Sequence, residues 1–409
     1  MIYKLEVENF MSLRNASVEL GPLTIFIGPN GSGKSAIFKA LVLLSKLLTG
    51  TPVRGSKGEL VFLEPGVTLN DLVWKRDAGL PIRFRLWLTD NTNTEADYSL
   101  ELKKQAEGWS VMKERIRTPT GWIDVDEYTP FEHPTERGRR THTPPLRATL
   151  WYLINLFAND KEARPVIEPI LRLSQAFGTA WRYRPSAIDI AHFVKRPTEP
   201  GRPVYVQENG WGVAAKLQDL NNSPDDREVF AAIEKALRNL FPHIQSIGFE
   251  NDYLGVRLSY RTDRTYEPVR APQESDGVLL ATFLLWRLHT SSKGMTVCLE
   301  EPENGLHPVL LAERFLLLKT VASKGHQVLA STHSPEFLRA LKRHPSQVWK
   351  EVRLVEFDAT GGTTVRSLYG MGEAKKLIDR YHDEMQERWG PAIKEWCGGE
   401  IKRPPEGDH

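Results

Sequence analysis

The chain opens with two stretches in which hydrophobic and polar residues alternate, and an almost wholly apolar stretch follows them. Apolar side chains occupy every second position in 3–7 and again in 16–20, which predicts two half-exposed strands. Residues 23–27 predict a buried strand, and the helix-forming segment 36–48 comes shortly after it. A glycine-rich octet separates this strand from the helix. The beginning of the chain therefore predicts two strands followed by a strand–loop–helix unit.

Short alternating strands dominate the next part of the chain. Between Ile82 and about Val125 they are separated by turn-like gaps, which predicts an antiparallel meander. Gly, Pro and Thr are frequent in 50–72, and basic polar residues are frequent in 130–145, so both segments are interpreted as loops. Beyond them we expect a helical stretch at 147–180 and a loop at 196–225. An amphipathic helix that ends before Pro242 is expected next, and a strand is expected at 254–261. The apolar face of this amphipathic helix contains Val229, Ile233, Leu237 and Leu240.

From residue 272 onward, helical and strand-like patterns alternate again, which is typical of an α/β fold. A helix is predicted over 275–288, and buried strands are predicted over 295–299 and 327–331. The other expected elements are a helix at 309–319, a closing hairpin made of 352–357 and 363–368, and a last helix at 373–388 before a polar tail.

Composition adds few constraints. The 409 residues are 40% hydrophobic and 26% charged with a net charge of +2, so a nucleic-acid partner would need a local basic patch. The two cysteines, Cys298 and Cys397, cannot build a disulfide framework, and Cys298 is expected in the core. The N-terminus lacks the pattern of a signal peptide, and no apolar run is long enough to cross a bilayer. We therefore expect a cytoplasmic protein with no membrane partner.

The glycine-rich octet fits the phosphate-binding pattern G-x-x-x-x-G-K-[ST] between a strand and a helix. Its glycines let backbone N–H groups converge on phosphate oxygens, and the N-terminus of the following helix adds partial positive charge. Lys34 is expected to contact the β- and γ-phosphates, and the Ser35 hydroxyl to bind Mg²⁺. The alternative is an ordinary glycine-rich turn. The predicted nucleotide-binding residues are Gly28, Pro29, Asn30, Gly31, Ser32, Gly33, Lys34 and Ser35.

Two carboxylates follow the buried strand at 295–299. The carboxyl ends of parallel strands lie at one edge of a sheet, so Glu300 and Glu301 are expected in the same crevice as the octet. We assign Glu300 to the Mg²⁺ shell and Glu301 to polarising the attacking water. The alternative is a strand-to-helix turn with solvated acids.

Histidine follows the next buried strand. His333 comes just after 327–331 and would reach the γ-phosphate side, although a lone histidine is more often a structural hydrogen-bonding group. His307 and His326 lack such a position and are interpreted as surface or turn residues.

Ser275 or Asp276 is expected to cap the helix at 275–288. A functional alternative is that Ser275 and Gly277 form a second phosphate-binding helix N-terminus, which acts on the nucleotide of a partner molecule.

In this order and spacing, the motifs resemble those of ABC-type ATPase heads of the SMC/RecF/OLD-like group. Residues 28–35 correspond to Walker A, 275–277 to a variant signature motif, 300–308 to Walker B and the D-loop, and 331–334 to the H-loop. Residues 9–13 are also similar to the N-terminal turn of this family.

The sequence departs from the family pattern at two points. Glu300 stands where most ABC proteins have Asp, although Glu-Glu-Pro-Glu is familiar in the OLD-like branch. The Q-loop glutamine of the family is expected between about 50 and 80, where no Gln occurs.

The resemblance implies an α/β fold, namely an ABC-type P-loop ATPase with a mixed or parallel core sheet, an antiparallel β subdomain and a largely helical insertion. Residues 1–125 and 245–370 would form the two parts of the head, 126–244 the helical insertion or lid, and 371–409 a C-terminal helix and polar tail. It also implies ATP and Mg²⁺ as cofactors, and an ATP-dependent homodimer in which Ser275 acts in trans.

Several functions remain open at this point. The first is an ATP-hydrolysing switch in DNA repair or anti-phage defence, with DNA or a nuclease effector as partner. The second is a slow or non-hydrolysing scaffold that holds a partner toxin or nuclease. A transporter subunit fits the Ser-Asp-Gly and Glu-Glu-Pro-Glu segments poorly. A self-contained OLD nuclease is disfavoured because few residues follow His333, and Asp379, Asp383 and Glu384 are interpreted as one solvated helical face.

Direct DNA binding has only weak support in the sequence. Arginines gather in or near the insertion, but basic loops are usually just solvated. The residues concerned are Arg137, Arg139, Arg140, Arg182 and Arg184.

Overall fold

The structure is a computed structural model. It describes residues 1–48, 67–89, 95–106, 108–118, 121–126, 181–183, 210, 212–252, 255–290, 295–302, 318, 322–323, 325–333 and 350–368. The predicted helices at 147–180, 309–319 and 373–388, the basic loop at 130–145, and Cys397 and His307 lie outside these described residues, apart from Leu318.

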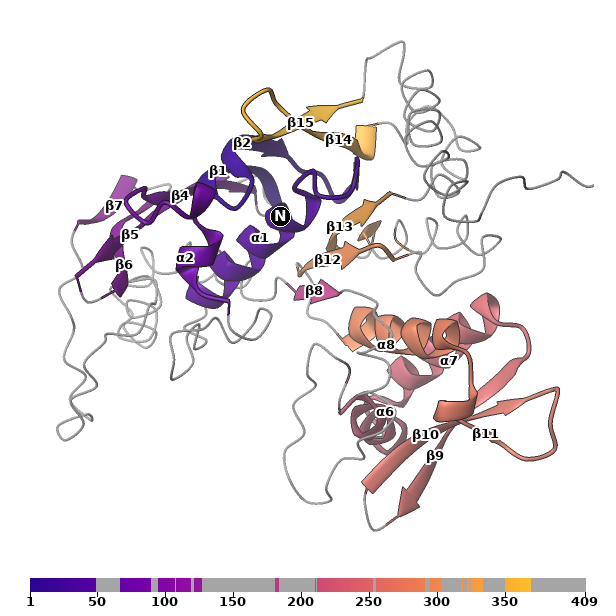
Figure 1. Ribbon diagram of the computed structural model, residues 1–409. Coiled ribbons are helices and arrows are strands. Elements are labelled where there is room, and N and C mark those ends of the chain that lie inside the picture. The colour runs from indigo at the N-terminus through magenta and orange to yellow at the C-terminus, as the bar shows by residue number, and fades with distance from the viewer. Residues whose placement is uncertain are drawn as a thin grey trace, which may run out of the picture.

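The N-terminal half of the described chain forms a six-stranded antiparallel sheet with the order β2-β1-β4-β5-β6-β7 (Figure 1). The alternating patterns in the sequence thus correctly predicted both the opening strands and the meander. One face of this sheet packs against the core with apolar side chains, and the opposite face carries charged side chains. Its strands are β1 (Ile2–Phe10), β2 (Leu13–Glu19), β4 (Ile82–Thr89), β5 (Glu95–Gln105), β6 (Gly108–Thr118) and β7 (Gly121–Asp126).

A second six-stranded sheet, the core sheet, has the order β15-β14-β3-β13-β12-β8. Strand β3 (Leu23–Ile27) lies between β13 (Gln327–Thr332) and β14 (Val352–Phe357), and it is parallel to both. Strand β12 (Thr296–Glu300) continues the parallel pairing, whereas β15 (Thr363–Ser367) folds back antiparallel to β14. The predicted mixed core sheet and its closing hairpin are therefore confirmed.

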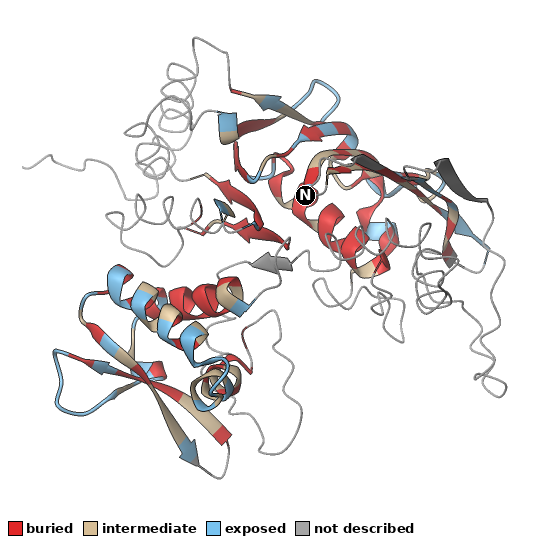
Figure 2. Cartoon of the chain, turned by 180° about the vertical axis from the view of Figure 1, so that it is seen from behind, coloured by how far each residue is buried: buried red, intermediate tan, exposed pale blue. Residues whose placement is uncertain are grey.

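Helices cover the two faces of the core sheet. Helix α1 (Lys34–Leu48) shares one hydrophobic cluster with the antiparallel sheet and with Phe26 of β3. Helix α8 (Asp276–Thr290) shares a second cluster with Leu23, Ile25 and Ile27 of the same strand. Because alternate residues of β3 enter different clusters, both of its faces are buried, and every residue of the strand except Thr24 is apolar. Figure 2 colours such buried residues red. Each such side chain stabilises the fold by about 1.5–3 kcal/mol.

A third, three-stranded sheet has the order β11-β10-β9 and packs with three helices (Figure 1). Its helices α6 and α7 come from the predicted insertion, yet they share a core with α8 across the predicted boundary at residue 244. The amphipathic helix ended by Pro242 is confirmed as α7. The elements are α6 (Val213–Asn222), α7 (Arg227–Leu240), β9 (Ile244–Asp252), β10 (Gly255–Thr262) and β11 (Val269–Arg270), followed by the short 3₁₀ turn Ala271–Gln273.

Three sequence interpretations were wrong, and they concern α2, α6 and strand β8. Within the predicted loop 50–72, residues Leu69–Leu72 form helix α2, followed by the 3₁₀ turn Trp74–Arg76, because Leu69 and Leu72 are buried in the first cluster. Helix α6 lies within the predicted loop 196–225, where Val213 and Leu217 pack into the second cluster.

Residues Trp181–Tyr183 form strand β8, which pairs with β12, so a segment assigned to the insertion completes the core sheet. His326, interpreted as a surface or turn residue, directly follows the turn at Gly325. It is buried at 7% exposure, because it immediately precedes the fully buried strand β13. Local patterns did not reveal these features because tertiary packing decides them. Cys298 is buried, as predicted.

Candidate functional site

The glycine-rich octet links the end of β3 to the start of α1. Gly31 and Gly33 have φ angles of 84° and 106°, in the region that glycine adopts without strain. A Cβ atom on Gly33 would also overlap the hydroxyl of Thr363, and one on Gly28 would overlap the carbonyl oxygen of Val355. The loop therefore needs glycine both for its turn and for its close approach to the hairpin β14–β15.

Lys34 lies at the start of α1 and is only 7% exposed. Its ammonium group donates hydrogen bonds to the carbonyl oxygens of Gly28 at 2.7 Å and Pro29 at 2.8 Å. The side chain thus folds back across the loop, with its charge held where the loop N–H groups and the positive end of α1 also lie.

Ser35 and Glu300 bring the two ends of the chain together. The Ser35 hydroxyl donates to Oε2 of Glu300 at 3.1 Å across 265 residues of sequence. Glu300 is buried at the carboxyl end of β12, two strands away from β3 in the core sheet. The parallel pairing of β12, β13 and β3 is what brings these two oxygen donors to the same edge.

The residues predicted to bind nucleotide end at Ser35. The next residue in the sequence is Ala36. The methyl group of Ala36 is buried in the first hydrophobic cluster, so it offers no hydroxyl to a phosphate or a metal ion. Of these two neighbouring positions in the first turn of α1, Ser35 alone carries a group suited to Mg²⁺.

Glu301 and His333 form a second contact at the same edge. Nδ1 of His333 lies 3.0 Å from Oε1 of Glu301, and both side chains are about one-third exposed, at 31% and 34%. Glu301 has a φ of 46°, a left-handed conformation that is unusual for a residue with a side chain. Its N–H donates to the carbonyl of Ser331 at 2.9 Å, so the strained residue is held by the neighbouring strand.

This backbone conformation decides where the carboxylate points. In a regular strand, Glu300 and Glu301 would face opposite sides of the sheet. The left-handed turn at Glu301 breaks that alternation, so one carboxylate contacts Ser35 while the next contacts His333. The site therefore combines a buried and a solvent-accessible carboxylate.

The remaining predicted site residues are placed as follows. Pro29, Asn30 and Ser32 lie in the loop itself, and Ser32 is buried. Ser275 precedes α8, and its carbonyl oxygen accepts the N–H groups of Val278 and Leu279 at 3.1 and 3.3 Å, as expected for an N-cap. Gly277 is buried in the first turn of α8. The hydrogen bonds of Ser275 are thus made with its own helix and with Glu274, whose carboxylate accepts the Ser275 N–H at 2.9 Å.

Sequence reasoning missed two residues that contact the loop. Thr363, the first residue of β15, contacts both the Ser32 carbonyl and the Ser12 hydroxyl. No motif marks Thr363, and the similarity of residues 9–13 to the N-terminal turn of the family did not predict the contact of Ser12 with Thr363. The contact depends on how the closing hairpin and the turn after β1 pack on the loop.

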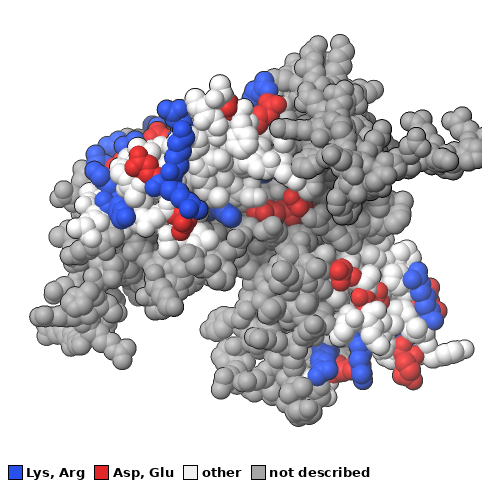
Figure 3. Space-filling view, in the orientation of Figure 1, with Lys and Arg blue, Asp and Glu red and all other residues white. Residues whose placement is uncertain are grey.

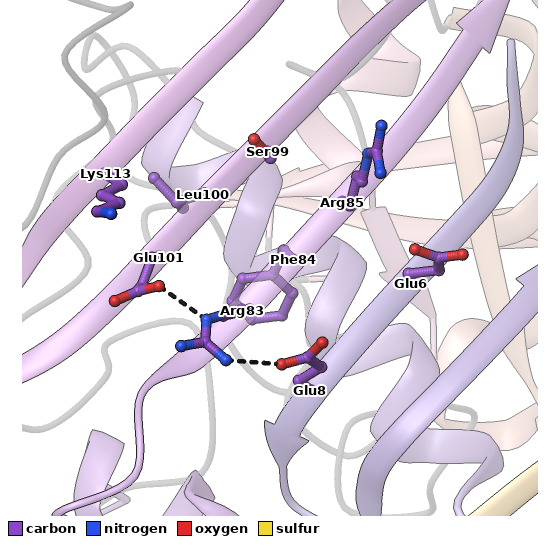
Figure 4. A pocket seen from close by; sticks show the side chains of 9 residues that line it. All are labelled: Glu6, Glu8, Arg83, Phe84, Arg85, Ser99, Leu100, Glu101 and Lys113. Carbon is purple, nitrogen blue, oxygen red and sulfur yellow. Dashed lines mark hydrogen bonds and ion pairs between the residues drawn. The ribbon is translucent and has the colours of Figure 1, made fainter. Parts of the chain in front are cut away.

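The outer face of the antiparallel sheet carries charges of both signs. The Arg83 guanidinium bonds Glu101 at 2.7 Å and Glu8 at 2.9 Å, and these bonds raise the pKa of Arg83 above its ordinary value, the one to Glu101 most (Figure 4). Arg85 and Asp97 form a bidentate pair at 2.6 and 3.0 Å. The blue and red side chains that lie together over this sheet in Figure 3 are therefore largely a cross-strand ladder of ion pairs, with a shallow hollow of about 270 Å³ among them.

Strand, phosphate loop and helix, with carboxylates and a histidine at the ends of adjacent parallel strands, define an ABC-type P-loop ATPase head. Comparisons with known proteins agree. Residues 23–339 match the family described as "AAA domain, putative AbiEii toxin, Type IV TA system". An OLD nuclease from Thermus scotoductus (strain ATCC 700910 / SA-01) is 46% identical over 415 residues, which cover 94% of this chain and 67% of that relative.

The chain therefore belongs to this AAA-domain family, with an OLD nuclease among its relatives. Among solved structures, an SMC head bound to the C-winged helix domain of ScpA is similar in fold, with a TM-score of 0.52 and 14% identity. The match covers 92% of this chain and 99% of that one. Among the described residues, no helix combines the length and apolarity needed to span a membrane.

Proposed function

We propose that the protein binds ATP with Mg²⁺ at the loop of residues 28–35 and hydrolyses it to ADP and phosphate. The observation that carries the proposal is the contact between Ser35 and Glu300 at 3.1 Å, beside the contact between Glu301 and His333 at 3.0 Å. The groups to which we assign phosphate binding and hydrolysis come from opposite ends of the sequence and lie at one edge of the core sheet.

The loop supplies the phosphate contacts. The Lys34 ammonium group donates hydrogen bonds to two neutral carbonyl oxygens. The oxygens of a bound phosphate would be stronger acceptors for this group, because they carry negative charge. Backbone N–H groups of Gly31, Gly33 and the start of α1 would bind the phosphates together with this charge. These contacts favour a polyphosphate nucleotide over a monophosphate.

The donor set fits Mg²⁺. Protein sites for this ion with a bound nucleotide use one or two protein oxygens, and phosphates and water complete the octahedron. The Ser35 hydroxyl and the Glu300 carboxylate are such a pair, and no cluster of three or more His, Cys, Asp or Glu side chains suited to a metal occurs within the described ranges. When bound, the ion would neutralise charge on the β- and γ-phosphates.

Glu301 and His333 suit the hydrolytic step. Glu301 would hold a water molecule and accept its proton as the water oxygen bonds to the γ-phosphorus. The bond from that phosphorus to the β–γ bridging oxygen breaks, and ADP leaves with the electron pair. His333 would keep the Glu301 carboxylate oriented toward the γ-phosphate, since its Nδ1 contacts Oε1 directly.

We further propose that ATP drives homodimerisation, with Ser275 and Gly277 at the start of α8 facing the partner's nucleotide, and that this switch acts on DNA or on a nuclease effector in DNA repair or defence. The similarity to an OLD nuclease supports this context. A scaffold that binds ATP with little turnover is the second candidate, because the loop contacts alone suffice for binding.

The test is ATP hydrolysis by the wild type, by Glu301→Gln and by a matched surface control, Glu8→Gln. Losing a general base costs about 10²- to 10⁴-fold in rate. Glu301→Gln should therefore bind ATP normally but turn over at least about 100-fold more slowly, whereas Glu8→Gln should match the wild type. Glu301→Gln with ATP should also elute as a dimer in size-exclusion chromatography.

Three outcomes separate the candidates. Equal hydrolysis by Glu301→Gln and the wild type would show that Glu301 is not the base. ATP binding with negligible hydrolysis by the wild type would favour the scaffold. A folded wild type that fails to bind ATP would overturn the whole proposal.

A further inference from the structure

The phosphate loop lies directly against two segments that come from opposite ends of the chain. Thr363 is buried, and its backbone N–H donates to the Ser12 carbonyl oxygen at 2.8 Å. Its hydroxyl lies 2.9 Å from the Ser32 carbonyl oxygen and 2.8 Å from Oγ of Ser12, 351 residues away in sequence. The loop, the turn after β1 and the closing hairpin therefore meet at one hydroxyl group.

The Thr363 hydroxyl is the donor in both contacts. A carbonyl oxygen only accepts, so the contact with Ser32 uses the single proton of the Thr363 hydroxyl. Oγ of Ser12 is placed to accept the same proton, so the two acceptors share it. The result is one buried donor that faces both the loop and the turn after β1.

Holding the Ser32 carbonyl also orients the next N–H group. The peptide unit between Ser32 and Gly33 is planar and trans, so its C=O and N–H point in opposite directions. With the carbonyl turned toward the hairpin, the Gly33 N–H points away from the hairpin. Gly33 cannot carry a side chain here, because a Cβ would overlap the Thr363 hydroxyl and lie 2.7 Å from Oγ of Ser12.

We propose that Thr363 is a positioning residue of the phosphate site, which aims the Gly33 N–H at the bound phosphate by holding the Ser32 carbonyl. The proposal rests on the proposed function, since it concerns the same site. It assigns a role in nucleotide affinity to the closing hairpin β14–β15, which carries none of the recognised motifs.

The experiment compares Thr363→Val, which keeps the shape but removes the donor, with Thr363→Ser, which keeps the donor. Thr364→Val is the matched control, because the Thr364 hydroxyl contacts the Glu356 carbonyl within the hairpin and not the loop. Affinity for ATP with Mg²⁺ is measured by titration calorimetry, and folding by thermal melting. Losing one hydrogen bond that orients a phosphate donor should weaken binding by about three- to tenfold in Thr363→Val. Thr363→Ser and Thr364→Val should bind like the wild type, and in Thr363→Val the KM for ATP should rise more than kcat falls.

Thr363→Val with wild-type affinity and only a lower melting temperature would overturn the inference, because the contact would then only stabilise the fold. If Thr363→Val does not fold, Thr363→Ala replaces it, because it also removes the donor; it should weaken ATP binding by about twofold or more, and unchanged affinity would again refute the inference. A folded wild type without ATP binding would instead refute the proposed function, so the two failures are distinguishable.

Discussion

Gln327 offers a test of how the core sheet is held together at the end opposite the site. Its side chain is 1% exposed and makes four hydrogen bonds. Oε1 accepts the Ile2 N–H and the Thr296 hydroxyl, both at 3.2 Å. Nε2 donates to the carbonyl oxygens of Ile2 at 2.5 Å and Gly21 at 3.0 Å. One amide thus joins β1, the turn before β3, and β12 to β13.

Gln327→Leu keeps the side chain at a similar size but leaves these four polar groups without their partner. Each buried polar group that loses its hydrogen bond costs about 1–3 kcal/mol, and at the lower end of that range the loss is about 4 kcal/mol. That is a large part of the 5–15 kcal/mol that typically separates folded from unfolded states. Thr296→Val, which removes only one of the four bonds, should cost about 1 kcal/mol.

The measurement is urea unfolding followed by tryptophan fluorescence, with ATP affinity measured below the transition. Gln327→Leu should shift the midpoint several times further than Thr296→Val. Its ATP affinity per folded molecule should equal that of the wild type, because Gln327 begins β13 and the site lies at the other end of that strand, roughly 17 Å away. A midpoint shift no larger than that of Thr296→Val would refute the reasoning.

Two further predictions concern titratable groups. Burial, and then the charge of Glu114, raise the pKa of Tyr98 well above its ordinary value, and its hydroxyl donates to Glu114 at 2.8 Å. Above about pH 10 only the unfolded chain ionises this tyrosine, so the free energy of unfolding should fall there. Tyr98→Phe should be less stable than the wild type at pH 8 by about 1–3 kcal/mol. Between pH 8 and 10.5, however, its free energy of unfolding, measured with urea, should fall less than that of the wild type. A parallel decline in the two proteins would contradict this. The Asp358 carboxylate accepts the hydroxyl of Thr360 and the N–H groups of Thr360 and Gly362, and the hydroxyl is the main cause of its lowered pKa. Its hold on the hairpin should persist above pH 3.8 and weaken as the pH falls through the lowered folded-state pKa. Asp358→Ala should therefore speed amide hydrogen exchange at Gly362 at neutral pH, whereas unchanged exchange would show that the β14–β15 pairing alone orders the turn.

Much of the architecture was predictable because its signals are local. The patterns of the alternating strands and of the phosphate loop each lie within a run of consecutive residues. The rule that parallel strands end at one edge of a sheet correctly predicted that Glu300 lies near the loop, where it contacts Ser35. The contact between Glu301 and His333 is consistent with the roles assigned to them, which remain predictions.

The features that sequence reasoning missed depend on distant pairing. Strand β8 is recognisable only through its partner β12, and its three residues carry too little pattern to stand out. Thr363 meets the loop only because β14 pairs with β3 in one particular register, which places the start of β15 beside Ser32. A polar residue that connects segments hundreds of positions apart, such as Gln327, looks like any other glutamine until the fold is known.

The central place of β3 has a consequence for how the chain folds as it is synthesised. The antiparallel sheet is complete once residue 126 has been made, but β3 waits for β13 and β14, some 300 residues after it. At about 5–20 residues per second, this apolar strand stays without its partners for roughly 15–60 s. During that interval the nascent chain exposes both edges of a strand that the finished protein buries completely. We therefore expect chaperones that bind nascent chains to engage this one between these two points, and slowing translation there to increase aggregation.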